Sequence, residues 1–472
     1  MKRPCALLLL LTLACVGGCT LAPKYVRPDA TVPSGWPEGP VYPDSLTLSD
    51  QPSAPELAPE EFFQDRNMRA ILDLALDNNL DLQLAALNVE KVRAYYKIQR
   101  ADLYPSLNAA GRGSRHRIPA DLSSTGEAMT AEEYGIDVGI SSWEIDLFGR
   151  VRSEKNQARE QYLASEAGWR GARLSLVAAI GQTYLALAAT REQLQLARST
   201  LVSQQSFYDI IQKRYDIGLT TKLDLRRAQT QVDYARRDVS ALTQLAAQDR
   251  NALELLVGTE VPDAWLPDDL SGVTPPRGIE PGLSSDILLG RPDIMAAEHR
   301  LRAANAYLGV ARASFFPRIS LTALLGTASA ALSGLFDTDS DSWTFSPQVV
   351  MPIFDLRTHA ALKASEADRQ IILTQYQSAI QVAFREVADA LAAKGTIDQQ
   401  VASQVSIVEA TEEAFSLAQM RYDEGIDSYL SVLDAQRSLY GAQQALVEIQ
   451  MLKLVNQIRL YAVLGGGGCV AE

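Results

Sequence analysis

The apolar positions of two distant stretches follow the same heptad pattern. In both, apolar residues recur at alternating steps of three and four, the spacing of one face of a long amphipathic helix. The first stripe consists of Leu225, Ala228, Val232, Ala235, Val239, Leu242 and Ala246, and the second of Val432, Ala435, Leu439, Ala442, Leu446 and Ile449. The stripes begin 207 residues apart. The pattern therefore predicts that a long helix has been duplicated.

A short motif precedes each stripe at the same separation. Arg214-Tyr215-Asp216-Ile217-Gly218 returns in the second half as Arg421-Tyr422-Asp423-Glu424-Gly425. The glycine that follows each Arg-Tyr pair allows the chain to reverse at a helix end. Each half is therefore predicted to form two long helices joined by a turn. The residues of these turns are Gly218, Leu219 and Thr220, and Gly425, Ile426 and Asp427.

Helical periodicity covers most of the remaining chain. It predicts helices over residues 67–103, 148–214, 220–257 and 291–316, and further long helices up to residue 464. The second of these carries another stripe, made largely of small residues: Ala164, Ala167, Gly171, Leu174, Ala178, Gly181, Leu185 and Ala188. Small residues allow close helix approach, so each helix can touch two neighbours, as in a cylinder. An ordinary antiparallel bundle is the alternative.

Four shorter segments alternate in the manner of strands, at about 104–118, 133–146, 317–329 and 342–354. In one of them, apolar Ile136 and Val138 alternate with Asp137 and Gly139, which predicts one apolar and one polar face. Strands of about ten residues suit a membrane barrel. Aromatic residues end the apolar face, as at membrane interfaces: Tyr134, Trp143, Trp343 and Phe345.

Four strands cannot close a barrel, because the smallest single-chain barrels have about eight. Open edges in lipid would leave backbone groups unpaired. Membrane-spanning strands would therefore require several chains to share one barrel. The alternative is a small soluble β-layer that caps a helical bundle.

The chain is thus predicted to be mainly α-helical, with four strands in two repeats. The first repeat covers residues 67–257 and the second 291–464. Residues 258–290 form a linker or equatorial segment, with room for a short helix or strand of its own. Residues 465–472 form a glycine-rich tail.

The N-terminus has the features of a lipoprotein signal over residues 1–18. Basic Lys2 and Arg3 precede an apolar run, which ends in Val16-Gly17-Gly18-Cys19. This resembles a bacterial lipobox and predicts lipidation at Cys19. Thr20 permits sorting to the outer membrane. An ordinary signal peptide with an incidental cysteine is the alternative. Residues 19–66 are rich in proline and are predicted to lie extended over a folded body or to act partly as a tether.

Charge and composition exclude several classes of function. The net charge of −13 argues against nucleic-acid binding. Beyond the signal, no run of 18 apolar residues predicts a membrane helix, so a membrane would be crossed by strands. His116, His299 and His359 are far apart in the sequence. No spacing predicts a metal site, a cofactor or a catalytic group, so an enzyme is not expected.

Several motifs together resemble one family. The mature start Cys19-Thr20-Leu21-Ala22-Pro23-Lys24-Tyr25-Val26-Arg27-Pro28 is similar to that of outer-membrane efflux lipoproteins. A second resemblance consists of Arg291-Pro292-Asp293-Ile294, Ala297-Glu298, Leu301, Ala304-Asn305-Ala306, Gly309, Ala311, Ala313 and Phe316-Pro317, and a third of Tyr429-Leu430 with Leu433-Asp434-Ala435-Gln436-Arg437. These motifs identify the chain as similar to the TolC-like outer membrane factors, in the lipoprotein (NodT/OprM-like) branch.

The resemblance implies a homotrimer with a twelve-stranded barrel in outer-membrane lipid, continuous with a helical periplasmic tunnel. It implies a passive exit duct, without cofactor, for a periplasmic adaptor and an inner-membrane pump of the resistance–nodulation–division class. A type I secretion duct is the alternative within the family. A periplasmic coiled-coil lipoprotein without a pore is the alternative outside it.

The resemblance also implies a periplasmic gate. It places Leu430 and Asp434 at the constriction, with Tyr422 and Arg437 as candidates for the contacts that hold it shut. Leu430 and Asp434 are four residues apart and share a helix face. In the first repeat Arg227 takes the position of Asp434 and Leu223 that of Leu430, and Asp224, adjacent to Leu223, is a weaker candidate. A solvated surface carboxylate is the alternative for Asp434. The two turns are implied to be the adaptor-docking surface.

Overall fold

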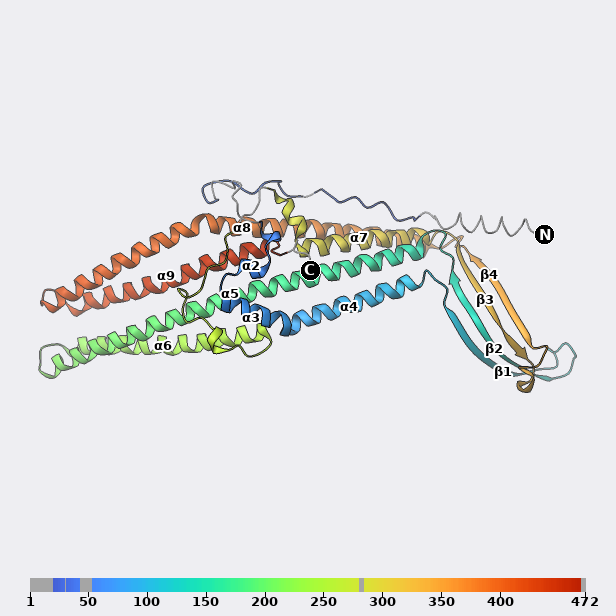
Figure 1. Ribbon diagram of the computed structural model, residues 1–472, viewed down its shortest axis with the longest axis horizontal. Coiled ribbons are helices and arrows are strands. Elements are labelled where there is room, and N and C mark those ends of the chain that lie inside the picture. Colours follow the sequence, from blue (N-terminus) through green and yellow to red (C-terminus); the bar gives the residue numbers. More distant parts are fainter. Residues whose placement is uncertain (1–19, 30, 43–52, 280–283, 468–472) are drawn as a thin grey trace. The chain divides into compact units, whose positions relative to one another are not determined.

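The computed structural model describes residues 20–29, 31–42, 53–279 and 284–467 (Figure 1). Cys19 and the predicted signal peptide lie outside the described residues. The described chain forms two compact units. The strand unit comprises residues 20–29, 88–166 and 296–376, and the hairpin unit comprises residues 31–42, 53–87, 167–279, 284–295 and 377–467.

Four long helices carry most of the chain. They are α5 (Arg150–Asp216), α6 (Lys222–Val257), α8 (Leu356–Asp423) and α9 (Tyr429–Val463). In the hairpin unit, α5 and α6 form one antiparallel pair and α8 and α9 form another (Figure 1). Three shorter helices are α3 (Arg66–Asn78), α4 (Leu80–Ala101) and α7 (Pro292–Ala313).

The predicted helix over 67–103 is interrupted at Asn79, which separates α3 from α4. The buried Asn79 side chain accepts a hydrogen bond from the Leu82 amide at 2.8 Å and donates one to the Leu256 carbonyl at 2.8 Å. Gly258, with φ of +80°, lies against the Asn78 carbonyl, where a Cβ would come within 2.4 Å. An asparagine side chain can form hydrogen bonds to the backbone in place of helical ones. Asn79 therefore separates α3 from α4, although neither proline nor glycine is present at the break.

The stripe of small residues on α5 packs as predicted. Ala164, Ala167, Ala178, Leu185 and Ala188 are all buried. Within this stripe, a Cβ added to Gly181 would lie 2.8 Å from Ile458 and 3.0 Å from Phe63. The small side chains thus let α5 approach its neighbours closely, which a row of leucines would prevent.

The four strands form one antiparallel sheet in the order β1-β2-β3-β4 (Figure 1). Their bounds differ from the predicted ones by up to four residues. They are β1 (Leu107–Ile118), β2 (Met129–Glu144), β3 (Arg318–Ser329) and β4 (Asp341–Val350). The β2–β3 pairing joins the two repeats. The outer edges of β1 and β4 pair with no other strand among the described residues.

The register gives the sheet one apolar and one polar face. Cross-strand partners share a face. Val138 pairs with Leu325, which pairs in turn with Trp343, whereas Asp137 pairs with Gly326 on the other face. The mainly apolar face carries Ile136, Val138, Ile140, Ala323, Leu325, Trp343 and Phe345, with Arg115, Arg117 and Glu132 as charged exceptions. The polar face carries Asn108, Arg112, Ser114, Asp137, Thr322, Thr344, Ser346 and Gln348, with Leu324 as an apolar exception.

A β-bulge places Trp143 on the apolar face. Strict alternation from Ile140 would put Trp143 on the polar face. The register shifts between these residues, so that Trp143 pairs with Leu321, and Ser142 between them has φ of +60°. Such a bulge inserts an extra residue and reverses the alternation beyond it.

Part of the proline-rich segment, predicted to be extended or a tether, instead belongs to the core. Residues 53–62 contain the short helices η2 (Ala54–Glu56) and α2 (Pro59–Phe62). Phe62 is fully buried and stacks on Tyr461 of α9 at 4.1 Å between ring centroids. The Tyr461 hydroxyl donates to the Leu57 carbonyl at 2.8 Å. Burial of these aromatic rings outweighs the extended preference of the prolines.

The described parts of the predicted linker, residues 258–279 and 284–290, contain short helices of their own and buried side chains. The short helices are η3 (Asp263–Trp265) and η4 (Ser285–Gly290). Val261, Leu266 and Leu270 are buried. The connection between β3 and β4 contains η5 (Leu332–Gly334).

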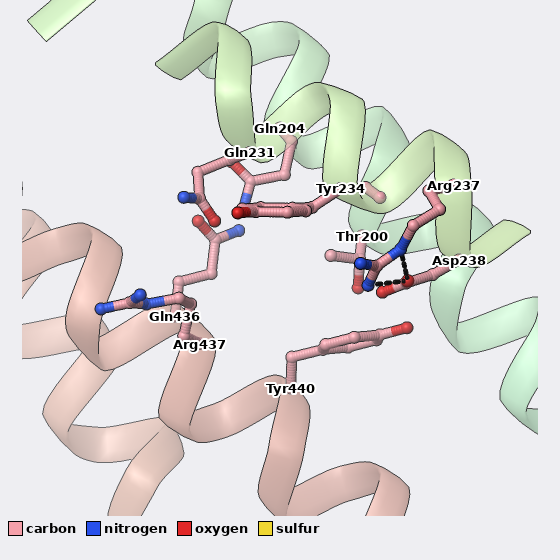
Figure 2. A pocket seen from close by; sticks show the side chains of 10 residues that line it. Thr200, Gln204, Gln231, Tyr234, Arg237, Asp238, Gln436, Arg437 and Tyr440 are labelled. Atoms are coloured by element: carbon pink, nitrogen blue, oxygen red, sulfur yellow. Dashed lines mark hydrogen bonds and ion pairs between the residues drawn. The ribbon is translucent and has the colours of Figure 1, made fainter. Parts of the chain in front are cut away.

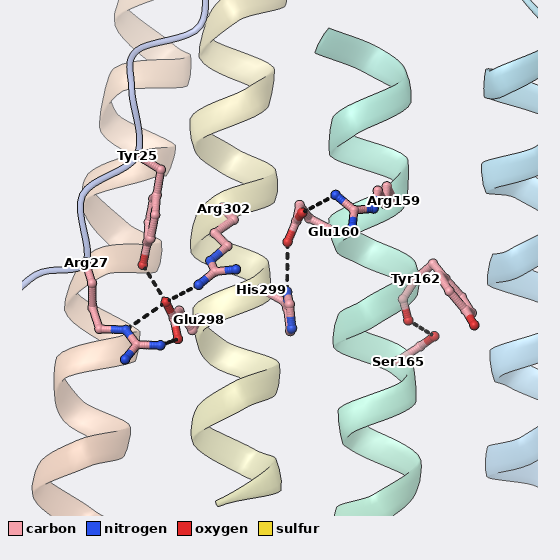
Figure 3. Close-up of polar contacts among 9 residues, drawn as sticks. All are labelled: Tyr25, Arg27, Arg159, Glu160, Tyr162, Ser165, Glu298, His299 and Arg302. Atoms are coloured by element: carbon pink, nitrogen blue, oxygen red, sulfur yellow. Dashed lines mark hydrogen bonds and ion pairs between the residues drawn. The ribbon is translucent and has the colours of Figure 1, made fainter. Parts of the chain in front are cut away.

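The N-terminal segment of the strand unit is fixed to α7 through Glu298 (Figure 3). The Glu298 carboxylate is buried, and Arg27 donates to it from Nε at 3.0 Å and from Nη2 at 2.8 Å. Arg302 and the Tyr25 hydroxyl also donate to it, at 2.7 and 3.1 Å. The residues that follow the predicted lipidation site therefore lie extended over a folded body.

The pKa values around Glu298 reflect this arrangement. Burial disfavours the charged form of Glu298, but hydrogen bonds from Arg27 and Arg302 outweigh it and lower the pKa of this carboxyl. Burial and the neighbouring carboxylate raise the pKa of Tyr25 to about 12. The cluster thus holds an ionised carboxylate, two guanidinium groups and a neutral phenol at neutral pH.

Candidate functional site

The two predicted turns end α5 and α8 with the same backbone geometry. At the first, the Leu219 amide donates to the Arg214 carbonyl at 2.8 Å and Gly218 has φ of +80°. At the second, the Ile426 amide donates to the Arg421 carbonyl at 2.9 Å and Gly425 has φ of +74°. These are Schellman turns, which place glycine in the left-handed region.

Different side chains secure the two turns. Thr221 caps α6, because its hydroxyl accepts from the Asp224 amide at 3.2 Å and donates to the Asp224 carboxylate at 2.6 Å. Asp224, the weaker gate candidate, is therefore engaged in a helix cap. The second turn has no side-chain cap at Ser428. Instead, Arg421 donates to the Asp427 carboxylate from Nε at 2.6 Å. This hydrogen bond lowers the pKa of Asp427.

A buried cluster beside the turns joins the two repeats. Its members come from both helix pairs: Ile211, Leu225 and Ala228 from the first, and Tyr429, Val432 and Leu433 from the second. Burial raises the pKa of Tyr429 to about 12, with the nearby Tyr422 as a further cause. The duplicated stripes thus meet each other in the hairpin unit.

Tyr422, predicted to hold the gate, contacts the first repeat. The Arg214 guanidinium donates to the Tyr422 hydroxyl at 2.9 Å and lies 5.1 Å from the centre of its ring. Arg214 was not predicted as a functional residue. Its signal was present in the sequence, because Arg214 belongs to the duplicated Arg-Tyr motif.

The three gate candidates of α9, which are Leu430, Asp434 and Arg437, lie on one exposed face. Leu430 is 43 % exposed, whereas Val432 and Leu433 beside it are buried. Asp434 and Arg437 form an ion pair within the helix, and both side chains are more than half exposed. The structure therefore brings Asp434 and Arg437 together, and leaves Leu430 free of the buried cluster.

A pocket of about 260 Å³ lies next to this face (Figure 2). Three helices line it: Thr200 and Gln204 from α5; Gln231, Tyr234, Ala235, Arg237 and Asp238 from α6; and Gln436, Arg437 and Tyr440 from α9. Figure 2 shows Gln231 and Gln436 turned toward each other across the pocket. These glutamines were not predicted, because neither a spacing nor a charge pattern in the sequence marks them.

Among the described residues, no group of histidine, cysteine, aspartate and glutamate is placed to hold a metal ion.

Of the described helices, α5 is long and apolar enough to cross a membrane by length and composition, although no such helix was expected. The most apolar part of α5 is 56 % buried. Helices in the core of a protein can be equally long and apolar. The packing of its small-residue stripe identifies α5 as such a core helix.

The chain is similar to known proteins over nearly its whole length. The family described as "Outer membrane efflux protein" matches residues 71–259 and 283–466. The solvent efflux pump outer membrane protein SrpC of Pseudomonas putida is 43 % identical over 460 residues, which covers 97 % of each chain. The outer membrane protein OprJ of Pseudomonas aeruginosa is 41 % identical over 474 residues, covering 99 % of this chain and 97 % of OprJ.

Solved structures give the same result. A membrane protein from Pseudomonas aeruginosa superposes with a TM-score of 0.88 at 41 % identity, covering 95 % of this chain and 98 % of that chain. The open state of the MtrE outer membrane channel of Neisseria gonorrhoeae superposes with a TM-score of 0.84 at 35 % identity, with the same coverage. The predicted fold class and function are confirmed. The chain belongs to the outer membrane efflux protein family and is an outer-membrane efflux channel, not an enzyme.

Proposed function

We propose that this protein is the trimeric exit duct of a tripartite efflux pump, which receives small molecules from a periplasmic adaptor and an inner-membrane pump of the resistance–nodulation–division class. The observation that carries this proposal is the two-faced sheet, whose outer edges pair with no strand in the part of the chain that the structure describes. Three copies would pair β4 of one chain with β1 of the next and close a twelve-stranded barrel, with no edge left in lipid.

This assembly is tested with the purified protein in planar bilayers. We expect a heat-resistant trimer on electrophoresis and stable single-channel currents. A monomer without currents would contradict the proposal.

The name of SrpC supports small organic molecules as the cargo. Dye efflux in cells that express the channel with and without an adaptor and pump measures whether export depends on these partners.

The lipid anchor is part of the proposal. Acylation at Cys19 would tether the chain to the membrane in the lipoprotein (NodT/OprM-like) manner. Mass spectrometry of the mature N-terminal peptide should find a cleaved, acylated Cys19. The Cys19→Ser variant should lack this modification.

The gate is proposed to be formed by Leu430 and Asp434, with contacts of Tyr422 and Arg437 holding it. Three-fold symmetry would make an apolar ring of Leu430 and an anionic ring of Asp434, which favours cations. The exposure of both side chains supports this role. Single-channel recordings of a Leu430→Ala, Asp434→Ala variant should show a higher conductance and weaker cation selectivity.

The duplication supplies a matched control for this experiment. Leu223 and Arg227 occupy the equivalent positions of α6. A Leu223→Ala, Arg227→Ala variant should leave the conductance near that of the unchanged protein. Equal effects of the two double variants on conductance would contradict a gate formed by Leu430 and Asp434.

Adaptor docking is proposed for the two turns at Gly218-Leu219-Thr220 and Gly425-Ile426-Asp427. Their exposed apolar side chains support this, since Leu219 and Ile426 are both largely exposed. Cysteines at these two positions should crosslink to an adaptor in an assembled pump. Crosslinks from a cysteine at exposed Leu255 of α6 serve as the control, and equal yields there would contradict docking at the turns.

A further inference from the structure

Arg112 of β1 lies flat along the polar face of the sheet. Its cross-strand partner is Gly135 of β2. A Cβ built on Gly135 would lie 3.2 Å from Arg112 Nε and 3.3 Å from Cζ. The guanidinium therefore rests directly over the glycine, in space that any larger residue would occupy.

One buried carboxylate holds the guanidinium in this position, and a second, exposed one lies near it. Glu133 and Asp137 flank Gly135 on the same face of β2, because side chains two residues apart share a face. Arg112 forms an ion pair with Asp137 and a longer contact with Glu133 at 3.6 Å. The Asp137 side chain is only 8 % exposed, whereas that of Arg112 is 53 % exposed. Arg112 thus covers a carboxylate that would otherwise face the space beside the sheet.

From this arrangement we infer that the Gly135–Arg112–Asp137 set determines the charge selectivity and clear width of the barrel lumen. The inference rests on the proposed trimeric barrel, in which the polar face lines the lumen. Each guanidinium is kept against the wall by Asp137 and neutralised by it. Released from the wall, three long cationic side chains would project into the lumen, where rings of charged groups select ions.

The first test compares two variants with opposite expected signs in planar bilayers at low salt, where charges are least screened. Asp137→Asn should free Arg112, lower the conductance and shift the zero-current potential toward the anion side. Arg112→Ala should uncover Asp137, raise the conductance and shift the potential toward the cation side. Shifts in the same direction would overturn the inference.

A third variant separates the effect of shape from that of charge. Gly135→Val keeps every charge but removes the space in which Arg112 lies. It should reproduce the lower conductance of Asp137→Asn. The addition of Arg112→Ala should then restore conductance. A Gly135→Val channel with unchanged conductance would overturn the inference.

The opposite face of the same strands supplies matched controls. Arg115 is three residues from Arg112 on β1, lies on the other face and pairs with Glu132 at 2.9 Å. Gly113, on that same face, lies against Tyr134, where a Cβ would come within 3.2 Å. Arg115→Ala and Gly113→Val should leave conductance and selectivity unchanged. Effects equal to those of the lumen variants would overturn the inference.

The outcomes also distinguish this inference from the proposed function. If the unchanged protein forms no trimer and no current, the barrel itself is refuted and the inference falls with it. If it conducts and the lumen variants behave like the controls, only the inference fails. If Asp137→Asn does not assemble into a heat-resistant trimer, Arg112→Ala and Gly135→Val decide alone, since both keep the Asp137 carboxylate.

Discussion

The turns that end α5 and α8 share a backbone and differ in their side chains. Gly218 and Gly425 both take the left-handed conformation, and both turns close with the same amide-to-carbonyl hydrogen bonds. The first turn is then held by the Thr221 cap and the second by the Arg421–Asp427 ion pair. A duplicated backbone has thus kept its geometry while its two copies acquired different local contacts. Mutations can therefore alter the contacts of one turn without altering those of the other.

The largest difference between the two copies is expected at the first residue of α6 and of α9, the helices that follow the turns. Tyr429 is buried in the cluster between the repeats, whereas Lys222, its counterpart in the first copy, is exposed. Truncating a buried aromatic residue to alanine costs about 3–5 kcal/mol, so Tyr429→Ala should increase hydrogen exchange strongly around both turns. Lys222→Ala, a surface change, should alter the free energy of local opening by less than about 0.5 kcal/mol. Equal effects would show that the cluster does not depend on Tyr429.

The two glycines should respond equally. A left-handed residue with a Cβ costs about 1–2 kcal/mol, and a Cβ at Gly218 or Gly425 would meet nothing within 4 Å. Gly218→Ala and Gly425→Ala should therefore lower the free energy of opening of their turns by similar amounts in hydrogen exchange. Gly441→Ala is the control, because Gly441 lies within α9 with open space around it. It should stabilise its helix by about 0.5–1 kcal/mol. Unequal losses at the two turns would indicate a side-chain cause.

Truncating the side chain of the residue before each helix should cost different amounts of stability in the two copies. Thr221→Ala should cost about 1 kcal/mol, because it removes a hydroxyl that accepts a helix amide. Ser428→Ala should cost a few tenths of a kcal/mol at most, because Ser428 makes no side-chain cap. The Thr221→Ser variant keeps the hydroxyl and should retain most of the stability. Hydrogen exchange of the first turn of α6 and of α9 measures all three variants, and a larger loss at Ser428 would reverse the comparison.

The smallest effect is a difference in pH dependence. The folded pKa of Asp427 lies below its unfolded value, which is about 3.9. Its contribution to stability is therefore present above about pH 4 and is lost as the pH falls through the folded pKa. The first turn carries Thr220 at this position. Hydrogen exchange between pH 6 and about pH 3, corrected for its intrinsic pH dependence, should show the second turn loosening more than the first. Asp427→Asn should abolish the difference.

The sequence predicted the long elements because their ends carry local signals. Gly218, Gly425 and Pro317 lie within a few residues of the helix ends that they predict. The break at Asn79 was missed because it depends on a hydrogen bond to Leu256, far away in the chain. The core position of Phe62 was missed for the same reason, since its stacking partner Tyr461 lies in α9.

The candidate site was predictable only in part. The duplicated motif led to the turns, and Tyr422 does contact the motif of the first repeat. The contact itself, with Arg214, depends on the packing of one helix pair against the other. Asp224 was predicted as a possible gate carboxylate because it lies beside Leu223, the counterpart of Leu430. The spacing of Thr221 and Asp224, which is that of a capping box, could have predicted its use in the cap instead.

The outer edges of β1 and β4, for which no described strand is a partner, have a consequence for the newly exported chain. Each edge offers a row of backbone donors and acceptors to any strand that it meets, correct or incorrect. A protomer that waits for two partners is thus exposed to mispairing for as long as it waits. That time shortens as protomers become more abundant, yet encounters between partly folded chains become more frequent as well. Yield should therefore pass through a maximum as the rate of synthesis rises, with aggregates beyond it.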